Sequence, residues 1–271
     1  MITSVRAERV VAARRLATRS FRAKRGLFLA EGPQAVREAL ARADGVAELY
    51  VTEAVAERHP EIVETARRGG VTVLPTTDEV VASLGDTVHP QGMVAVCRFL
   101  DVPIGRAVAP GTRLVALLAH VRDPGNAGTV IRCADAAGAD AVVLTGESVD
   151  VYNPKTVRAT AGSLFHLPLA TGAAIEDAVA ACRAAGLRIL AADGSGPADL
   201  DDEADAGSLA GPTCWIFGNE AWGLPRAVRE LADATVRIPI HGRAESLNLS
   251  TAAAVCLYAS ARAHRRTTAA S

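Results

Sequence analysis

Three polar-rich segments in the second half of the chain are candidates for chemistry. They span 120–128, 217–225 and 238–250, and each follows a predicted strand. In open parallel α/β sheets, ligands bind beyond the carboxyl ends of the strands, so these segments predict one ligand site. Amide, hydroxyl, carboxylate and guanidinium groups there can hold a polar ligand. The candidate side chains are Asn126, Arg132, Glu220, Ser246 and Asn248.

Each of these features also has a simpler structural explanation. Asn126 could cap the helix that follows it, and Glu220 could complement a helix dipole. Arg132 could be a surface charge, Ser246 could be an N-cap, and Gly218 could mark a tight turn. Any one signal is weak, but three such loops in one predicted domain favour a functional site.

Other catalytic constellations are missing from the sequence. There is no phosphate-binding P-loop and no nucleophile elbow, and the Gly194–Gly196 segment lacks the third glycine of a dinucleotide site. The five cysteines are widely spaced without a C-x-x-C pair, and the six histidines show no ligand spacing. We therefore expect no disulfide framework and no metal site, and a reducing, cytoplasmic location.

The elements that must position the candidate residues alternate in type. Near-continuous apolar strands separated by helices predict an α/β domain whose parallel sheet has helices on both faces. The predicted strands span 114–119, 141–144, 187–191, 214–217 and 235–238, and the predicted helices span 128–137, 154–161, 175–185, 225–231 and 250–264.

The first hundred residues predict a second, smaller α/β domain, with strands at 46–51, 71–74 and 93–97. The stretch 101–111 is rich in Pro and Gly and has no periodicity, which predicts a linker. The expected organisation is a domain over 1–100, a linker over 101–111 and a domain over 112–271.

Composition fits two globular domains without a membrane span. The chain has 271 residues, of which 49% are hydrophobic, and its 29 basic and 30 acidic side chains give a net charge of −1. Its longest apolar run, Leu114 to Ala119, is far shorter than the ~20 residues of a membrane helix. Basic residues are concentrated before Arg25, which indicates either a contact with a polyanion or a solvated helix surface.

The candidate segments resemble a known family. The runs DPGNAGTVIRCADAAGAD, FGNEAWGLP and IPIHGRAESLNLSTAAAVCLYA occur in that order. They resemble the three signature motifs of the SpoU/TrmH family, which are S-adenosylmethionine-dependent RNA 2′-O-ribose methyltransferases of the SPOUT superfamily. The first hundred residues are similar to that family's RNA-binding domain, which has a ribosomal-protein-like fold. The layout resembles the members that act on ribosomal RNA.

The resemblance implies a fold, a cofactor and a set of residues. It implies a deep C-terminal trefoil knot, a homodimer with each active site at the subunit interface, and methylation of 23S ribosomal RNA. It assigns catalytic positions to Asn126, Arg132, Glu220, Ser246 and Asn248. It assigns S-adenosylmethionine contacts to Gly218, Asn219, Ile238, Ile240 and Leu247. Ala221 and Trp222 stand where the family often has Gly and a small or polar residue.

Arg132 is expected to hold the phosphate beside the ribose and to stabilise the developing alkoxide, because a guanidinium rarely gives up its proton. RNA is expected to meet the basic N-terminal arm and the rim of the catalytic pocket. The residues expected to contact RNA are Arg14, Arg15, Arg19, Arg22, Lys24 and Arg25 in the arm, and Lys155 and Arg158 at the rim of the catalytic pocket.

Three other functions compete with this interpretation. They are a tRNA 2′-O-methyltransferase, a noncatalytic RNA-binding or ribosome-assembly factor on the same fold, and a nicotinamide-dependent oxidoreductase. The full set of motif residues argues against a noncatalytic factor, and the missing glycine fingerprint argues against the oxidoreductase. The sequence leaves open the nucleotide modified, the choice between free RNA and an assembled particle, a role in antibiotic resistance and the proton acceptor.

Overall fold

The computed structural model describes residues 1–85, 87 and 89–269, and it divides into two compact units. The first unit contains Met1–Leu100 and Tyr152–His166, and the second contains Asp101–Val151 and Leu167–Ser271. Among the described residues, no helix has both the length and the apolar character that a membrane span requires.

The first unit is built on a four-stranded mixed sheet with the order β1-β4-β2-β3. Only β2 and β3 run parallel. The strands are β1 (Leu27–Glu31), β2 (Val46–Thr52), β3 (Thr72–Thr76) and β4 (Met93–Arg98). Within the Met1–Leu100 segment, the helices of this unit are α1 (Glu8–Arg14), η1 (Arg15–Ala17), α2 (Arg19–Arg25), α3 (Pro33–Ala41), α4 (Glu53–Arg58), α5 (Pro60–Arg68) and α6 (Asp78–Leu84).

The first unit also includes a segment from the middle of the chain, which holds α9 (Pro154–Ala159) and η2 (Ser163–Phe165). We had placed this segment in the domain spanning 112–271. Aromatic packing accounts for its position, because the ring of Tyr152 stacks on Phe99 at 4.0 Å and lies 4.7 Å from Phe28. The Tyr152 hydroxyl also accepts a hydrogen bond from the backbone N–H of Leu100 at 2.6 Å.

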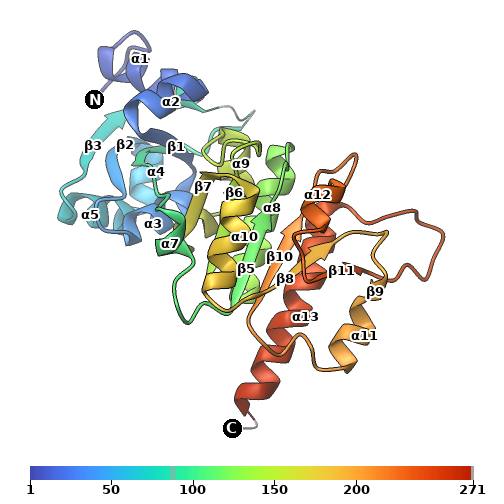
Figure 1. Ribbon diagram of the computed structural model, residues 1–271. Helices are drawn as coiled ribbons and strands as arrows, with labels where there is room; N and C mark the ends of the chain where they lie inside the picture. The colour runs from blue at the N-terminus through green and yellow to red at the C-terminus, as the bar shows by residue number, and fades with distance from the viewer. Residues whose placement is uncertain (86, 88, 270–271) are drawn as a thin grey trace. The chain divides into compact units, whose positions relative to one another are not determined.

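The second unit contains a seven-stranded sheet with the order β7-β6-β5-β10-β8-β11-β9, and every pair of neighbours runs parallel. This confirms the predicted parallel α/β sheet (Figure 1). The strands are β5 (Leu114–Leu118), β6 (Ala141–Thr145), β7 (Leu169–Ala173), β8 (Arg188–Ala192), β9 (Ala198–Asp199), β10 (Thr213–Phe217) and β11 (Ala234–Arg237).

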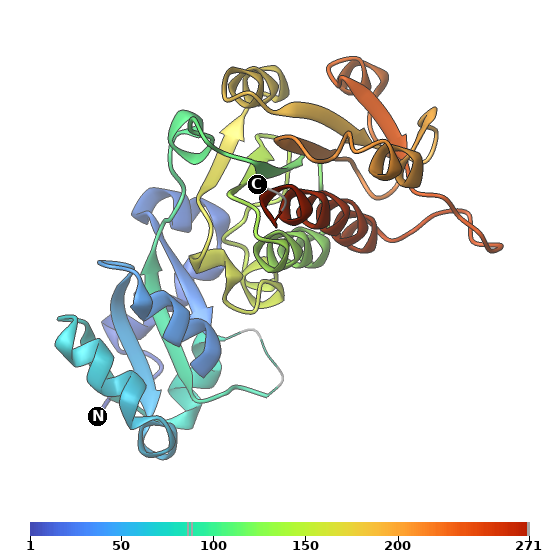
Figure 2. The ribbon, with the colours of Figure 1, turned by 90° about the horizontal axis from the view of Figure 1, so that it is seen from below.

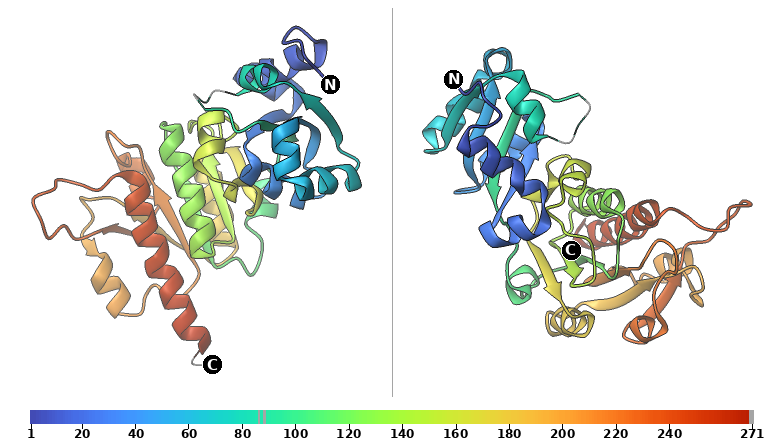
Figure 3. Two further views of the ribbon diagram at one scale, coloured as in Figure 1. Left: turned by 180° about the vertical axis from the view of Figure 1, so that it is seen from behind. Right: turned by 90° about the horizontal axis from the view of Figure 1, so that it is seen from above.

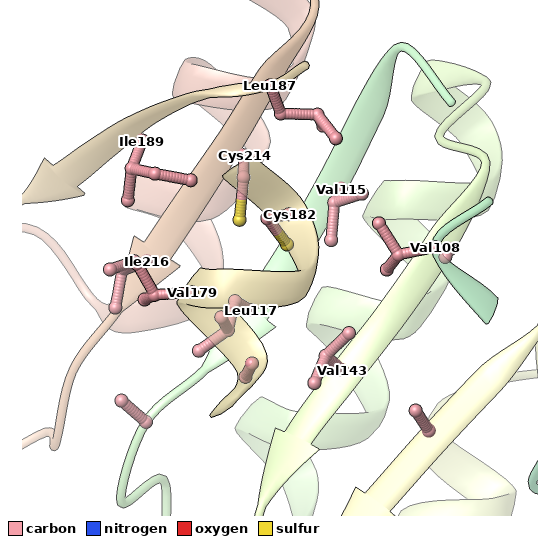
Figure 4. Packing of buried hydrophobic residues seen from close by; sticks show 14 of the residues in the cluster. Val108, Val115, Leu117, Val143, Val179, Cys182, Leu187, Ile189, Cys214 and Ile216 are labelled. Carbon is pink, nitrogen blue, oxygen red and sulfur yellow. The ribbon is translucent and has the colours of Figure 1, made fainter. Parts of the chain in front are cut away.

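Helices cover both faces of this sheet. One face packs against α7 (Ile104–Ala107) and α10 (Ile175–Ala184), where Leu117 of β5 and Ile216 of β10 belong to a buried cluster (Figure 4). The opposite face packs against α8 (Pro124–Ala137) and α13 (Leu249–Ala269), which lie side by side (Figure 2). There the indole N–H of Trp215 donates to Ser260 Oγ of α13 at 2.9 Å. Two shorter helices complete the unit, α11 (Leu200–Asp205) and α12 (Arg226–Arg229).

Residues 101–111, which we expected to be a linker, are a folded part of the second unit. They contain α7, and Ala107 and Val108 are each only 4% exposed in the cluster beneath α10. The backbone N–H of Val102 donates to Leu169 O of β7 at 2.8 Å. The Pro and Gly residues therefore shape a short helical connection rather than a flexible spacer.

Candidate active site at the carboxyl ends of the parallel strands

A cavity of about 640 Å³ lies at the carboxyl ends of β8, β10 and β11 in the second unit. Its walls come from the loop after β8, the turn after β10 and the loop that joins β11 to α13. That last loop extends away from the sheet, and residues 240–248 are exposed (Figure 3). A site here follows the general rule for parallel sheets.

All five residues that we expected to contact a cofactor line this cavity. They are Gly218, Asn219, Ile238, Ile240 and Leu247. Glu220 and Ser246, two of the expected catalytic residues, also contribute to its walls. The structure therefore gathers residues from two distant loops around one space.

The turn after β10 requires glycine at two positions. A Cβ atom on Gly218 would lie 2.5 Å from the carbonyl oxygen of Gly223, and Gly223 itself has a φ of +67°. The backbones of Asn219 and Gly223 exchange hydrogen bonds of 2.9 and 3.0 Å, which close the turn. Because the two backbones approach so closely, position 218 has no room for a side chain, and the cavity wall there is formed by backbone.

Glu220 joins this turn to the start of α8. Its carboxylate accepts hydrogen bonds from the backbone N–H groups of Arg122 at 3.4 Å and Asp123 at 3.2 Å. It also accepts one from Asn126 Nδ2 at 3.2 Å. Glu220 therefore fixes the loop after β10 against the loop after β5.

Asn126 extends the connection to the third loop. Its side-chain oxygen accepts a hydrogen bond from Asn248 Nδ2 at 3.1 Å. Asn248 Oδ1 in turn accepts from the backbone N–H and the hydroxyl of Ser250, at 2.9 and 2.6 Å, at the start of α13. The helix cap of α8 is Asp123, whose Oδ1 accepts from the Asn126 backbone N–H at 2.7 Å. The Asn126 side chain thus bridges two loops instead of capping.

Arg132 lies apart from these residues within the chain. It is exposed on α8 and does not line the cavity. It stands about 9 Å further along the helix than Asn126 and roughly 120° around it. A single copy of the chain therefore brings together four of the five expected catalytic residues and leaves Arg132 on another face of the helix.

Sequence reasoning missed Asp193, which lines the cavity in the loop after β8. Partial burial acts to raise its pKa, but hydrogen bonds from Ser195 and the Leu224 N–H, together with nearby Arg229, hold that pKa below its usual value. A carboxylate is therefore maintained on the wall. The signal in the sequence was the Asp-Gly-Ser run directly after a predicted strand.

The expected RNA-contacting residues of the first unit differ in exposure. Arg14, Arg15, Arg19, Lys24 and Arg25 are exposed. Arg22 is only 2% exposed, and its guanidinium donates to the carbonyl oxygens of Leu16 and Ala17, both at 2.7 Å. The assignment of Arg22 to RNA contact is wrong, because its charge is committed to the backbone of η1.

A second cavity, of about 360 Å³, lies within the first unit. Arg14 and Arg158 both line it, although α1 and α9 are far apart in the sequence. Lys155 is exposed on the same helix as Arg158, and neither residue lines the cavity of the second unit, where both were expected at the rim. Over the described part of the chain, no group of three or more His, Cys, Asp or Glu side chains could hold a metal ion.

Comparison with known proteins matches both halves of the chain. Residues 113–258 match the SpoU rRNA methylase family, and residues 7–95 match the MRM3-like substrate-binding domain. The chain is 34% identical to the 23S rRNA (guanosine(2553)-2′-O)-methyltransferase RlmP of Bacillus subtilis, over 95% of this chain and 97% of that protein.

Solved structures agree with this match. The SpoU methyltransferase AviRb of Streptomyces viridochromogenes, in complex with the cofactor AdoMet, is 32% identical with a TM-score of 0.85, over 97% of this chain and 99% of that chain. An AdoMet-bound rRNA methyltransferase of Sinorhizobium meliloti is 32% identical with a TM-score of 0.83, over 96% of this chain and 97% of that chain. The motif resemblance is thus confirmed, and the chain belongs to the SpoU rRNA methylase family.

Proposed function

We propose that this protein transfers a methyl group from S-adenosylmethionine to a ribose 2′-hydroxyl of 23S ribosomal RNA. The observation that carries the proposal is the hydrogen-bonded junction of Glu220, Asn126 and Asn248 beside the cavity. This junction fixes three loops that are distant in sequence, in a family whose relatives act on 23S rRNA. Loops held this firmly can orient two reactants, which is a major source of rate enhancement.

The cavity suits S-adenosylmethionine in size and chemistry. Its volume of about 640 Å³ lies within the usual range for small-molecule sites, roughly 300–1,000 Å³. Apolar walls at Ile238, Ile240 and Leu247 fit the adenine, and the Asp193 carboxylate complements the cationic groups of the molecule. When bound, the cofactor supplies an activated methyl group. The residues that line the cavity hold the cofactor, and Gly218 adds no side chain to the wall.

We assign Arg132 to the RNA rather than to the cofactor. In this assignment, its guanidinium binds the phosphate next to the target ribose and stabilises negative charge on the 2′-oxygen as its proton leaves. Asn126, Glu220, Ser246 and Asn248 position the loops around this step. The side chain of Arg132 is exposed on α8, so it is accessible to a second macromolecule.

A homodimer would complete the site, with Arg132 reaching the cavity of the other copy. The exposed faces of α8 and α13 support this arrangement. Val255 and Tyr258 of α13 are 39% and 50% exposed, and the Tyr258 hydroxyl donates to Ala136 O of α8 at 3.3 Å. Two exposed apolar side chains of this size on one helix are typical of an interface between identical subunits. We further propose that α13 follows a trefoil-knotted path, as the motif resemblance implies.

We propose that the first unit binds the RNA. Five exposed basic side chains between Arg14 and Arg25 attract phosphates, and Arg14 and Arg158 flank the same cavity. Such contacts would make RNA affinity fall steeply with salt. A ribosomal RNA substrate supports the cytoplasmic location that we also propose.

Calorimetry tests the cofactor part of this proposal directly. S-adenosylmethionine is titrated into the wild-type protein, with NAD as the control ligand. We expect binding of S-adenosylmethionine at micromolar to millimolar concentrations, on the order of the range for enzyme substrates. Binding of NAD with no response to S-adenosylmethionine would refute the assignment.

A further inference from the structure

Trp222 is an unusual residue on the rim of the second unit's cavity. The chain has two tryptophans, of which Trp215 is fully buried and Trp222 is 50% exposed. Trp222 nevertheless lines the cavity, in the turn that carries Glu220. An indole half open to water beside an active site is available to a ligand, because tertiary packing covers only part of its apolar surface.

His120 supports Trp222 from the neighbouring loop. The two ring centroids lie 5.6 Å apart, with the planes inclined by 53°. His120 adopts a φ of +59°, in the left-handed region that only a few per cent of residues other than glycine occupy. Strain of this kind persists only where the surroundings fix the residue, and it occurs preferentially at binding and catalytic sites.

Three contacts hold His120 in this strained position. Its Nδ1 lies 2.5 Å from Glu147 Oε2, and its backbone N–H donates to Thr145 Oγ1 at 3.3 Å. Its carbonyl oxygen accepts a hydrogen bond from Asn219 Nδ2 at 3.0 Å. Glu147 therefore holds the imidazole and the two hydrogen bonds hold the backbone, which together keep the ring against the indole of Trp222.

We propose that Trp222, supported by His120, is a stacking platform for a nucleobase of the RNA substrate at the mouth of the active site. Single-stranded RNA bases stack on aromatic side chains, and each such contact contributes substantially to affinity. The proposal rests on the proposed RNA methyltransferase function and adds a base-binding subsite to it. Ala221 and Trp222 stand where the motif resemblance implies Gly and a small or polar residue, so the platform would be a property of this chain.

The position of Trp222 favours RNA over cofactor as its ligand. Trp222 lines the cavity together with the expected cofactor contacts, but its ring also contacts His120, which is not a lining residue, and half of the side chain is exposed. The exposed half of the indole is therefore available to a ligand that approaches the cavity from outside. The RNA, which must bring a ribose to the methyl donor, is such a ligand.

Substitution of Trp222 separates the two ligands. We expect Trp222→Ala to weaken RNA binding about 5- to 150-fold, measured as KM for 23S rRNA from a strain that lacks the gene. The Kd of S-adenosylmethionine should change less than about 2-fold, well below the effect of a lost stacking contact. Trp222→Phe should recover most of the RNA affinity, whereas Trp222→Leu, which is apolar but cannot stack, should not. Weakened S-adenosylmethionine binding with an unchanged KM for RNA would overturn the proposal.

His120→Asn tests the support separately from the platform. Asparagine tolerates a positive φ, so this variant should fold as well as wild type while losing the ring beneath Trp222. We expect KM for RNA to rise less than in Trp222→Ala, and the double variant to be no worse than Trp222→Ala alone. Additive effects of the two substitutions would show that His120 does not act through Trp222.

Tryptophan fluorescence supplies a readout that does not depend on turnover. Trp215 is buried, so quenching by added 23S rRNA should come from Trp222 and should disappear in Trp222→Phe. S-adenosylmethionine alone should leave the emission nearly unchanged. If wild type methylates the RNA but shows neither quenching nor a change in KM on Trp222→Ala, the platform is wrong and the proposed function stands. If wild type methylates no RNA, the proposed function itself fails.

Discussion

Asn126 and Glu220 are 94 positions apart in the sequence, yet Asn126 Nδ2 donates to Glu220 Oε1 across 3.2 Å. The hydrogen bond joins the first turn of α8 to the turn after β10. Because Asn126 also accepts a hydrogen bond from Asn248, a single side chain connects all three candidate loops. The shape of the cavity therefore depends on the side-chain amide of Asn126, which donates to Glu220 and accepts from Asn248.

Substitutions of Asn126 should show this dependence. Asn126→Ala removes two hydrogen bonds, and we expect S-adenosylmethionine affinity to fall about 2- to 10-fold for each bond lost. Asn126→Asp should be worse than Asn126→Ala, because it places a second carboxylate against Glu220. Calorimetric Kd values for the two variants check this order. If Asn126→Asp bound as well as wild type, the amide would have no bridging role.

The proposed sharing of active sites between two copies makes a specific prediction for mixed variants. Arg132→Ala and Glu220→Gln should each be nearly inactive alone. If Arg132 serves the cavity of the other copy, an equal mixture refolded together should regain about a quarter of wild-type activity, since half of the dimers are mixed and each has one intact site. Methyl transfer to 23S rRNA is measured before and after mixing. Zero recovery, with mixed dimers demonstrated by tagged chains, would place Arg132 in its own chain's site.

The depressed pKa of Asp193 predicts a pH dependence of stability. A carboxyl whose folded pKa lies below its unfolded value, about 3.9, stabilises the fold above that value. The stabilisation is lost as the pH falls through the folded pKa. The difference in unfolding free energy between wild type and Asp193→Asn should thus be constant near pH 7 and shrink below about pH 4. Urea unfolding at several pH values measures it, and a difference that grows toward low pH would contradict the assignment.

Arg22 and Arg19, which lie in the same helix, allow a matched comparison of a buried and an exposed arginine. Arg22→Ala leaves the carbonyl oxygens of Leu16 and Ala17 without their donor, and we expect a loss of about 1–3 kcal/mol in stability. Arg19→Ala should leave stability unchanged and lower the slope of log affinity against log salt for RNA by about 0.7–0.9. Thermal unfolding and filter binding separate the two effects. Equal loss of stability in both variants would contradict the distinction.

Burial on both faces makes a strand easiest to predict from sequence, although the partly exposed strands β3 and β11 were predicted as well. β5 and β10 consist wholly of buried residues, and their apolar runs placed them within a residue of their observed bounds. The three strands that were not predicted, β1, β7 and β9, all lie at sheet edges. Edge strands have a single neighbour, so they need less continuous apolar character.

The residues of the site that belong to the three sequence motifs could be predicted. The loops of Asn126, Glu220 and Asn248 could be assigned to one sheet edge, because the carboxyl ends of parallel strands lie together. The capping role of Asp123 and the buried state of Arg22 depend on local geometry that charge patterns do not reveal. The pairing of His120 with Trp222 depends on tertiary contacts between distant loops, which a single sequence does not encode in any short pattern.

A methyl-transfer assay is the decisive test of the proposed function. Deproteinised 23S rRNA from a strain that lacks the gene is incubated with the protein and S-adenosylmethionine labelled in its methyl group, and the RNA is digested to nucleosides. We expect label in a 2′-O-methylnucleoside with wild type and none with Arg132→Ala. Label on a base would contradict the proposed function. The absence of label both from this RNA and from assembled large subunits treated in the same way would also contradict it.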